Sequence, residues 1–146
     1  MIYLASDHAG FPLKEEVKKY LLEKGEAVED LGVNSTESAD YAIYSHKLAN
    51  AVLGNPEAKG IGICGSGLGI SMGLNRHNGI RAARSMSVED AELSRKHNNA
   101  NVLVLSGRQT AIADAKQIVD AFLTTEFEGG RHEKRIQNLD LNSSDE

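Results

Sequence analysis

The feature that most constrains the fold is the stretch from Gly60 to Ser71, which reads Gly-Ile-Gly-Ile-Cys-Gly-Ser-Gly-Leu-Gly-Ile-Ser. It begins as a short β-branched strand and ends at an expected helix start, after three glycines at alternate positions, Gly65, Gly67 and Gly69. Alternating glycines let backbone N–H groups point toward one centre, and a following helix adds the positive end of its dipole. The stretch is therefore typical of an anion-binding loop, and it places the only cysteine, Cys64, where a thiolate is stabilised.

Strand and helix patterns alternate along the whole chain. Short strands are expected at 2–5, 27–31, 60–64, 79–83 and 102–105, and helices at 12–24, 40–53, from the glycines to 74, 87–96, 110–123 and 131 to about 139. Five strands that each precede a helix predict a parallel sheet with right-handed crossovers. The expected fold is α/β, a Rossmann-like three-layer αβα sandwich. Residues 1–146 are expected to form a single domain with a C-terminal helical segment from about 131.

Charge and hydropathy exclude several classes of function. The formal net charge of −5 at pH 7 argues against nonspecific binding to nucleic acids or membranes, which a basic surface would favour. No apolar run approaches the roughly 20 residues of a membrane span, and the first residues do not resemble a secretory signal. One cysteine cannot form an internal disulfide, which fits a reducing compartment. We therefore expect a cytoplasmic protein with a small-molecule ligand, and neither a nucleic-acid nor a membrane partner.

Polar residues follow the expected strands at one edge of the sheet, where parallel α/β sheets bind ligands. They lie in the segments Asp7-His8, Cys64 to Gly69, Arg84-Ser85 and Ser106 to Arg108. Taken alone, a cysteine after a buried strand is more often an inert small side chain, and Asp7-His8 equally fits a helix cap beside a surface histidine. Three glycines in five residues exceed what one turn needs, and this favours a ligand cradle beside a reactive Cys64.

Two further groups lie toward the C-terminus. Arg131 and Arg135 are four residues apart, so they share one face of the expected helix. Such charges usually form a solvated face, but two guanidiniums after a Gly-Gly turn also suit a phosphate. His97-Asn98 lies in a polar junction that equally fits the end of a helix.

Other motifs fit the stretch poorly. The stretch lacks the third glycine of a dinucleotide-binding fingerprint, because Ile70 and Met72 occupy the candidate positions. It also lacks the lysine of a P-loop. A cysteine-phosphatase loop would need an arginine at position 70. Gly69 to Gly73 matches the pattern of a nucleophile elbow. That elbow requires a strand that runs up to its serine, and the glycines just upstream are incompatible with such a strand. The 5 histidines show neither i,i+4 pairing nor a cysteine partner, so no metal site is expected.

The chain carries five segments in the order of one family: Ser6-Asp7-His8-Ala9-Gly10, Ile63 to Ser71, Ser94-Arg95-Lys96-His97-Asn98, Asn101-Val102-Leu103 and Glu128 to Arg135. Together they resemble the type B ribose-5-phosphate isomerases, a family that includes allose-6-phosphate isomerase and the galactose-6-phosphate isomerase subunits. The resemblance implies aldose–ketose isomerisation through a cis-enediol, without metal or cofactor. The expected pair is ribose 5-phosphate and ribulose 5-phosphate.

The resemblance also implies a role for each site residue. Cys64 would remove the proton alpha to the carbonyl, and His97 would open the sugar ring. The Ser66 hydroxyl would stabilise the developing oxyanion together with the amides of Gly65, Gly67, Leu68 and Gly69. Contacts to the sugar would come from Asp7, Tyr41 and Asn98. Contacts to the phosphate would come from His8, Arg108, Arg131 and Arg135. Because relatives build each site across a dimer interface, a homodimer or a dimer of dimers with composite active sites is expected.

Two questions stay open at this point. The family often has Asp-Tyr-Pro where this chain has Asp40-Tyr41-Ala42, and the loss of proline leaves the placement of Tyr41 open. A six-carbon substrate, allose 6-phosphate or galactose 6-phosphate, is the alternative, because pocket depth decides sugar length. A nonenzymatic sugar-phosphate-binding module would keep the glycines and arginines but would not need Cys64 or His97.

Overall fold

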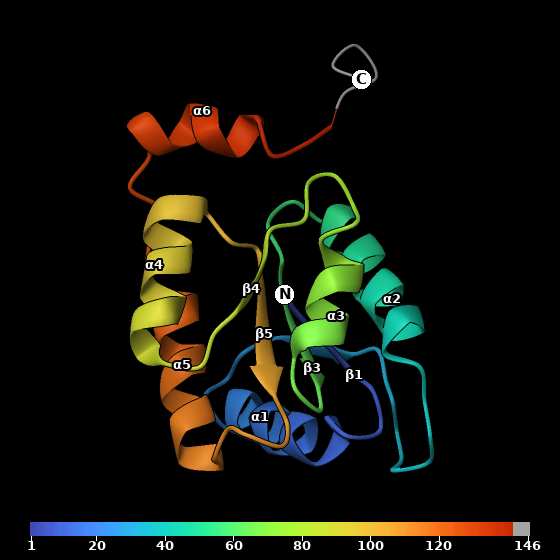
Figure 1. Cartoon of the computed structure of the whole chain (residues 1–146). Helices are drawn as coiled ribbons and strands as arrows, with labels where there is room; N and C mark the ends of the chain where they lie inside the picture. The colour runs from blue at the N-terminus through green and yellow to red at the C-terminus, as the bar shows by residue number, and fades with distance from the viewer. Residues whose placement is uncertain (142–146) are drawn as a thin grey trace.

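The computed structural model describes residues 1–141 and has the expected α/β fold (Figure 1). All pairings in the five-stranded sheet are parallel, in the order β2-β1-β3-β5-β4. The strands are β1 (Ile2–Ser6), β2 (Val28–Asp30), β3 (Lys59–Cys64), β4 (Ala82–Arg84) and β5 (Val102–Ser106). The helices are α1 (Phe11–Glu23), α2 (Tyr41–Leu53), α3 (Leu68–Leu74), α4 (Val88–Asn98), α5 (Ile112–Thr124) and α6 (Arg131–Gln137).

Two hydrophobic cores lie on the two faces of the sheet, as strand alternation requires. Within β5, Leu103 and Leu105 face the core formed with α1 and α5, which contains Phe122. Val102 and Val104 face the opposite core, formed with α2 and α3. Because β5 is buried on both faces, it reads as a continuous apolar run in the sequence. The three-layer sandwich predicted from the sequence is therefore confirmed.

The expected elements are present, with shifted boundaries. The fourth strand begins at Ala82, three residues after the expected start. His97 and Asn98 lie in the last turn of α4 instead of in a junction after it, and Asn99 ends the helix with φ +47°. No helix within residues 1–141 is both long and apolar enough to cross a membrane.

Candidate active site

The loops that follow β1, β3 and β5 meet at the carboxyl edge of the sheet. The Asp7 N–H donates to the Ile63 carbonyl at 3.2 Å, and the Gly107 N–H donates to the Cys64 carbonyl at 2.8 Å. The Arg108 N–H donates to the Gly65 carbonyl at 3.0 Å. These bonds place the segment after each strand directly beside Cys64.

Two glycines let these backbones approach one another. A Cβ on Gly107 would lie 2.7 Å from the Ala9 carbonyl oxygen, and a Cβ on Gly10 would collide with the Ile63 carbonyl. Neither neighbour is a flexible side chain that could move aside. The close contact fixes the position of Asp7 and His8 relative to Cys64.

A cavity of about 200 Å³ lies among these loops. Every lining residue except Ala9 is one that the sequence predicts for the site: Asp7, His8, Tyr41, Cys64, Gly65, Ser66, Gly69 and Arg108. The expected gathering of polar residues at one edge of the sheet is therefore observed. Their chemical roles stay predictions.

The Cys64 side chain is buried, and its sulfur accepts a hydrogen bond from the Gly67 N–H at 3.2 Å. Gly67 is the N-cap of α3 and has φ +81°, a conformation that favours glycine. The carbonyl of the same peptide group, that of Ser66, accepts a hydrogen bond from Arg84 Nε at 2.8 Å. The N–H dipole thus points its positive end at the sulfur, which stabilises negative charge there.

Arg84 contacts the glycine loop from outside the cavity, a contact that sequence analysis does not identify. It ends the edge strand β4, and its Nη2 also donates to Gln109 Oε1 at 3.0 Å. The side chain therefore joins the loop after β5 to the Ser66–Gly67 peptide. Its place at a strand end is visible in the sequence, but its contact with one carbonyl depends on tertiary structure.

The glycine loop offers fewer free donors than the sequence predicts. The Gly67 N–H is used by the Cys64 sulfur, and the Leu68 N–H donates to Ser66 Oγ at 3.1 Å. Both amides thus have partners within the loop, and their expected role toward an oxyanion stays a prediction. Both bonds form within the loop itself and hold its shape.

Asp7 and His8 are both anchored by backbone. One carboxylate oxygen of Asp7 accepts from the Gly10 N–H at 2.9 Å. The His8 Nδ1 lies 3.1 Å from the Ala39 nitrogen and 3.2 Å from its carbonyl oxygen. When Nδ1 accepts from the Ala39 N–H, Nε2 carries the ring hydrogen and can donate to a ligand.

Tyr41 lines the cavity even though the family's proline is absent. Asp40 is the N-cap of α2, and its Oδ1 accepts from the Ala42 N–H at 2.8 Å. A proline at position 42 has no N–H to donate, so alanine permits a capping bond that proline would prevent. The ring of Tyr41 packs against Gly69, where a Cβ would lie 2.6 Å from a ring carbon.

Arg108 supplies positive charge to the same cavity. Its guanidinium lies over Gly65, at 3.1 Å from the position that a Cβ on this glycine would occupy. No carboxylate among residues 1–141 forms an ion pair with it. A guanidinium without a carboxylate partner is suited to bind a phosphate.

The remaining predicted residues lie at the opposite end of the molecule. His97 and Asn98 end α4, whose 11 residues span about 16 Å from the carboxyl edge toward the amino edge. Arg131 and Arg135 lie on α6, beyond the same end of α4 (Figure 1). A single chain therefore does not bring these four residues to Cys64.

His97 belongs to a cluster that sequence analysis does not identify. Its ring stacks on that of His132, with centroids 4.5 Å apart. Its Nε2 lies 3.8 Å from Glu128 Oε1, and His132 Nε2 lies 3.7 Å from the same oxygen. Burial lowers the pKa of His132, as do the charges of Arg131, His97 and Arg135, while Glu128 opposes this shift.

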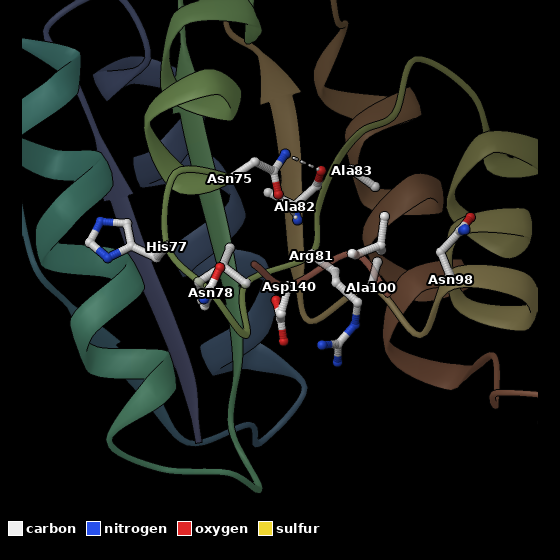
Figure 2. Close-up of a pocket in the computed structure, with 11 residues that line it drawn as sticks. Asn75, His77, Asn78, Arg81, Ala82, Ala83, Asn98, Ala100 and Asp140 are labelled. Atoms are coloured by element: carbon white, nitrogen blue, oxygen red, sulfur yellow. Dashed lines mark hydrogen bonds between the residues drawn. The ribbon is translucent and has the colours of Figure 1, made fainter. Parts of the chain in front are cut away.

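Asn98 also lines a second cavity, of about 340 Å³, at the amino edge of the sheet (Figure 2). Figure 2 shows the Arg81 guanidinium and the Asp140 carboxylate on the wall of the same cavity. Burial lowers the pKa of Arg81, and the charge of Asp140 partly offsets this effect. The Gly79 N–H donates to Asp140 at 2.8 Å, which ties the segment after α6 to this edge.

Comparison with known proteins assigns the family. The chain is 44% identical to ribose-5-phosphate isomerase B of Escherichia coli over 138 residues, which cover 94% of this chain and 93% of the relative. A crystal structure of a ribose 5-phosphate isomerase from Thermotoga maritima is 53% identical, with a TM-score of 0.94 over 95% of this chain and 96% of that one. A ribose-5-phosphate isomerase B from Mycoplasma genitalium, solved with bound ribulose 5-phosphate, is 41% identical, with a TM-score of 0.90 over 94% and 92%. A family model described as ribose/galactose isomerase matches residues 2–139, and the chain belongs to this family.

Proposed function

We propose that the chain is an aldose–ketose isomerase that interconverts ribose 5-phosphate and ribulose 5-phosphate. The observation that carries the proposal is the buried Cys64 sulfur beside a polar cavity, with the Gly67 N–H aimed at it at 3.2 Å. This arrangement provides a base next to hydrogen-bond donors, as proton abstraction alpha to a carbonyl requires. The bound ribulose 5-phosphate of the Mycoplasma genitalium relative supports the choice of substrate.

The reaction needs one proton to move between neighbouring carbons. The Cys64 thiolate takes the proton from C2 of the open-chain aldose, and the electron pair moves onto the carbonyl oxygen to form a cis-enediolate. The Ser66 hydroxyl and the free loop amides donate to this oxygen while its charge develops. The thiol then returns the proton to C1, and a proton passes between the two oxygens to complete the ketose.

The substrate must first be opened from its ring, and its phosphate must be held. We assign ring opening to His97, sugar contacts to Asp7, Tyr41 and Asn98, and phosphate contacts to His8, Arg108, Arg131 and Arg135. The guanidiniums suit the phosphate because each can donate two hydrogen bonds to it. Arg84 acts on the reaction only through the Ser66–Gly67 peptide, as a positioning residue.

The active unit is a homodimer, or a dimer of dimers, with composite sites. The residues around Cys64 lie at the carboxyl edge of the sheet, whereas the group that contains His97 lies at the amino edge. A complete active site therefore requires the amino edge of a second copy of the chain. Apolar side chains beside the cavity support this arrangement, because Tyr41 and Ile43 of α2 and Leu68 and Met72 of α3 are 44–65% exposed. Exposed apolar side chains such as Ile43 are typical of a surface that a partner covers.

The remaining expectations complete the proposal. The chain works as a single domain in the cytoplasm, without a cofactor or a nucleic-acid partner. The net charge of −5 and the single cysteine support these assignments. The positive charge that the ligand needs is supplied locally, by Arg108 in the cavity.

A side-by-side assay of five- and six-carbon sugar phosphates tests this function. We expect turnover of ribose 5-phosphate and a large loss in Cys64→Ala, with Cys64→Ser as the closest control in size. Preferential turnover of allose 6-phosphate or galactose 6-phosphate would overturn the choice of substrate. A Cys64→Ala variant that keeps full activity would overturn the assignment of the base.

A further inference from the structure

Three potential metal ligands meet at the amino edge of the molecule. They are His97 in the last turn of α4, Glu128 in the segment before α6, and His132 in the first turn of α6. One ligand atom from each lies within 4.8 Å of the other two, and both histidine Nε2 atoms are within 3.8 Å of Glu128 Oε1. Ligand atoms bound to one tetrahedral Zn²⁺ are about 3.3–3.6 Å apart and the ion lies near the plane of each imidazole, so the two stacked rings must rotate for both Nε2 lone pairs to meet one ion.

His132 supplies an independent indication of a ligand. Its side chain is only 8% exposed, and its Nε2 is buried without a hydrogen-bond partner among residues 1–141. A buried polar nitrogen without a partner costs free energy, and most such atoms in proteins are satisfied. This nitrogen faces Glu128, where a metal ion could accept its lone pair.

The backbone holds the three side chains in place. The Glu128 N–H donates to the Lys96 carbonyl at 3.1 Å, which ties the segment before α6 to the end of α4. The His132 N–H donates to the Gly129 carbonyl at 3.3 Å and fixes the start of α6. The stacked rings of His97 and His132 are inclined by 22°. Two of the three ligands therefore lie on helices, and the third lies in the exposed segment that joins α5 to α6.

The ligand types determine which ions fit. Two imidazoles and one carboxylate match the protein ligands of open Zn²⁺ sites, in which water takes the fourth position. Mg²⁺ and Ca²⁺ prefer oxygen ligands, and only one carboxylate is present here. Arg131 and Arg135 lie on the same short helix and oppose any ion that is held by charge alone. Imidazole-binding ions such as Zn²⁺ are favoured over both hard cations.

We propose that His97, Glu128 and His132 form a binding site for Zn²⁺ or a similar divalent ion, and that the bound ion inhibits the enzyme. The ion would occupy the lone pair of His97 Nε2, so this nitrogen could no longer exchange a proton with the sugar ring. The binding site itself is independent of the reaction. The inhibition rests on the proposed function, in which His97 opens the ring.

Direct binding of the metal tests the site. Zn²⁺ is titrated into the metal-free protein by calorimetry, and Co²⁺ is followed by its visible absorption. The test variant is Glu128→Gln, which removes one ligand at an exposed position. The matched control is Glu126→Gln, which removes the same charge two residues away, also at an exposed position. We expect one ion per chain, bound at least about tenfold more weakly by Glu128→Gln and equally by Glu126→Gln.

Two binding results would overturn the site. One is equal affinity in the wild type and in Glu128→Gln. The other is a sulfur-to-cobalt charge-transfer absorption, which would place the ion on Cys64. Since binding is measured without substrate, either result stands whether or not the chain isomerises ribose 5-phosphate.

The isomerase assay tests the consequence of binding. We expect Zn²⁺ to inhibit the wild type and Glu126→Gln alike, and we expect Glu128→Gln to need at least about tenfold more Zn²⁺ for the same fractional loss. Equal inhibition of all three proteins would overturn the inhibitory role of this site.

Discussion

Arg84 offers the sharpest test of how the fold supports the chemistry, because it reaches Cys64 only through one peptide group. Its Nε donates to the Ser66 carbonyl at 2.8 Å, and the N–H of the same peptide donates to the Cys64 sulfur at 3.2 Å. In Arg84→Met the donors are lost while an unbranched side chain that reaches about as far as the Nε position is kept. A hydrogen bond from a charged group contributes about 1.5–3 kcal/mol, and Arg84 is partly exposed, which favours the lower end of this range.

The free energy of the lost hydrogen bond predicts a decrease in kcat. If the bond is needed to hold the loop in the transition state, 1.5–3 kcal/mol corresponds to a decrease in kcat of about ten- to hundredfold. KM should change little, because Arg84 does not line the cavity of about 200 Å³. The assay is steady-state kinetics on ribose 5-phosphate. The rate at which Cys64 is alkylated at a fixed pH gives a second readout, which reports on the environment of its sulfur. The signal comes from Cys64 alone, because the chain has no other cysteine.

Gln109→Ala is the matched control, because it removes the other side-chain contact of Arg84 and leaves the bond to Ser66. We expect kcat within about threefold of the wild type in this variant, because the bond from Arg84 Nη2 to Gln109 is exposed and water can replace the lost acceptor. An Arg84→Met enzyme with wild-type kcat and alkylation rate would refute the reasoning. So would a raised KM at unchanged kcat, which would indicate that Arg84 contacts the substrate directly.

Two further predictions concern stability. Asp40→Ala should lower the free energy of unfolding by about 1 kcal/mol in chemical denaturation, because Asp40 caps α2 at the Ala42 N–H, whereas Asp40→Asn should retain most of it. Burial raises the pKa of Asp30, but hydrogen bonds from Lys14, a backbone N–H and Lys18 outweigh burial and leave this pKa lowered. Its contribution to stability is therefore complete above its unfolded pKa of about 3.9 and is lost as the pH falls through the folded value. Asp30→Asn should destabilise the protein at pH 7 and have a smaller effect in acid, and an equal effect at both pH values would contradict this assignment.

The sequence predicts the architecture well because the signals are local. The apolar run from Val102 to Leu105 indicates a strand that is buried on both faces, and Gly65, Gly67 and Gly69 mark the ligand loop. Ser87 caps its helix as its type suggests, since its hydroxyl accepts from the Asp90 N–H at 3.1 Å. Such features depend on neighbours within a few residues in the chain.

The features that the sequence does not reveal depend on contacts between distant segments. The contact of Arg84 with the Ser66 carbonyl joins the end of β4 to the loop after β3, and β5 lies between these two strands in the sheet. Similarly, Glu128 and His132 approach His97 because α6 packs beyond the end of α4. The predicted site residues lie at the two opposite edges of the sheet because α4 runs back from the carboxyl edge and returns His97 to the amino edge.

The composite site is the central claim, and mixing two inactive variants tests it most directly. Cys64→Ala and His97→Ala subunits are unfolded and refolded together, or co-expressed, and then assayed with ribose 5-phosphate. In a mixed dimer one site receives an intact Cys64 from one subunit and an intact His97 from the other. With random pairing half of the dimers are mixed, so about a quarter of the wild-type activity should return. Activity no higher than that of the two separate variants would contradict the account, because it would place Cys64 and His97 of one site on the same chain.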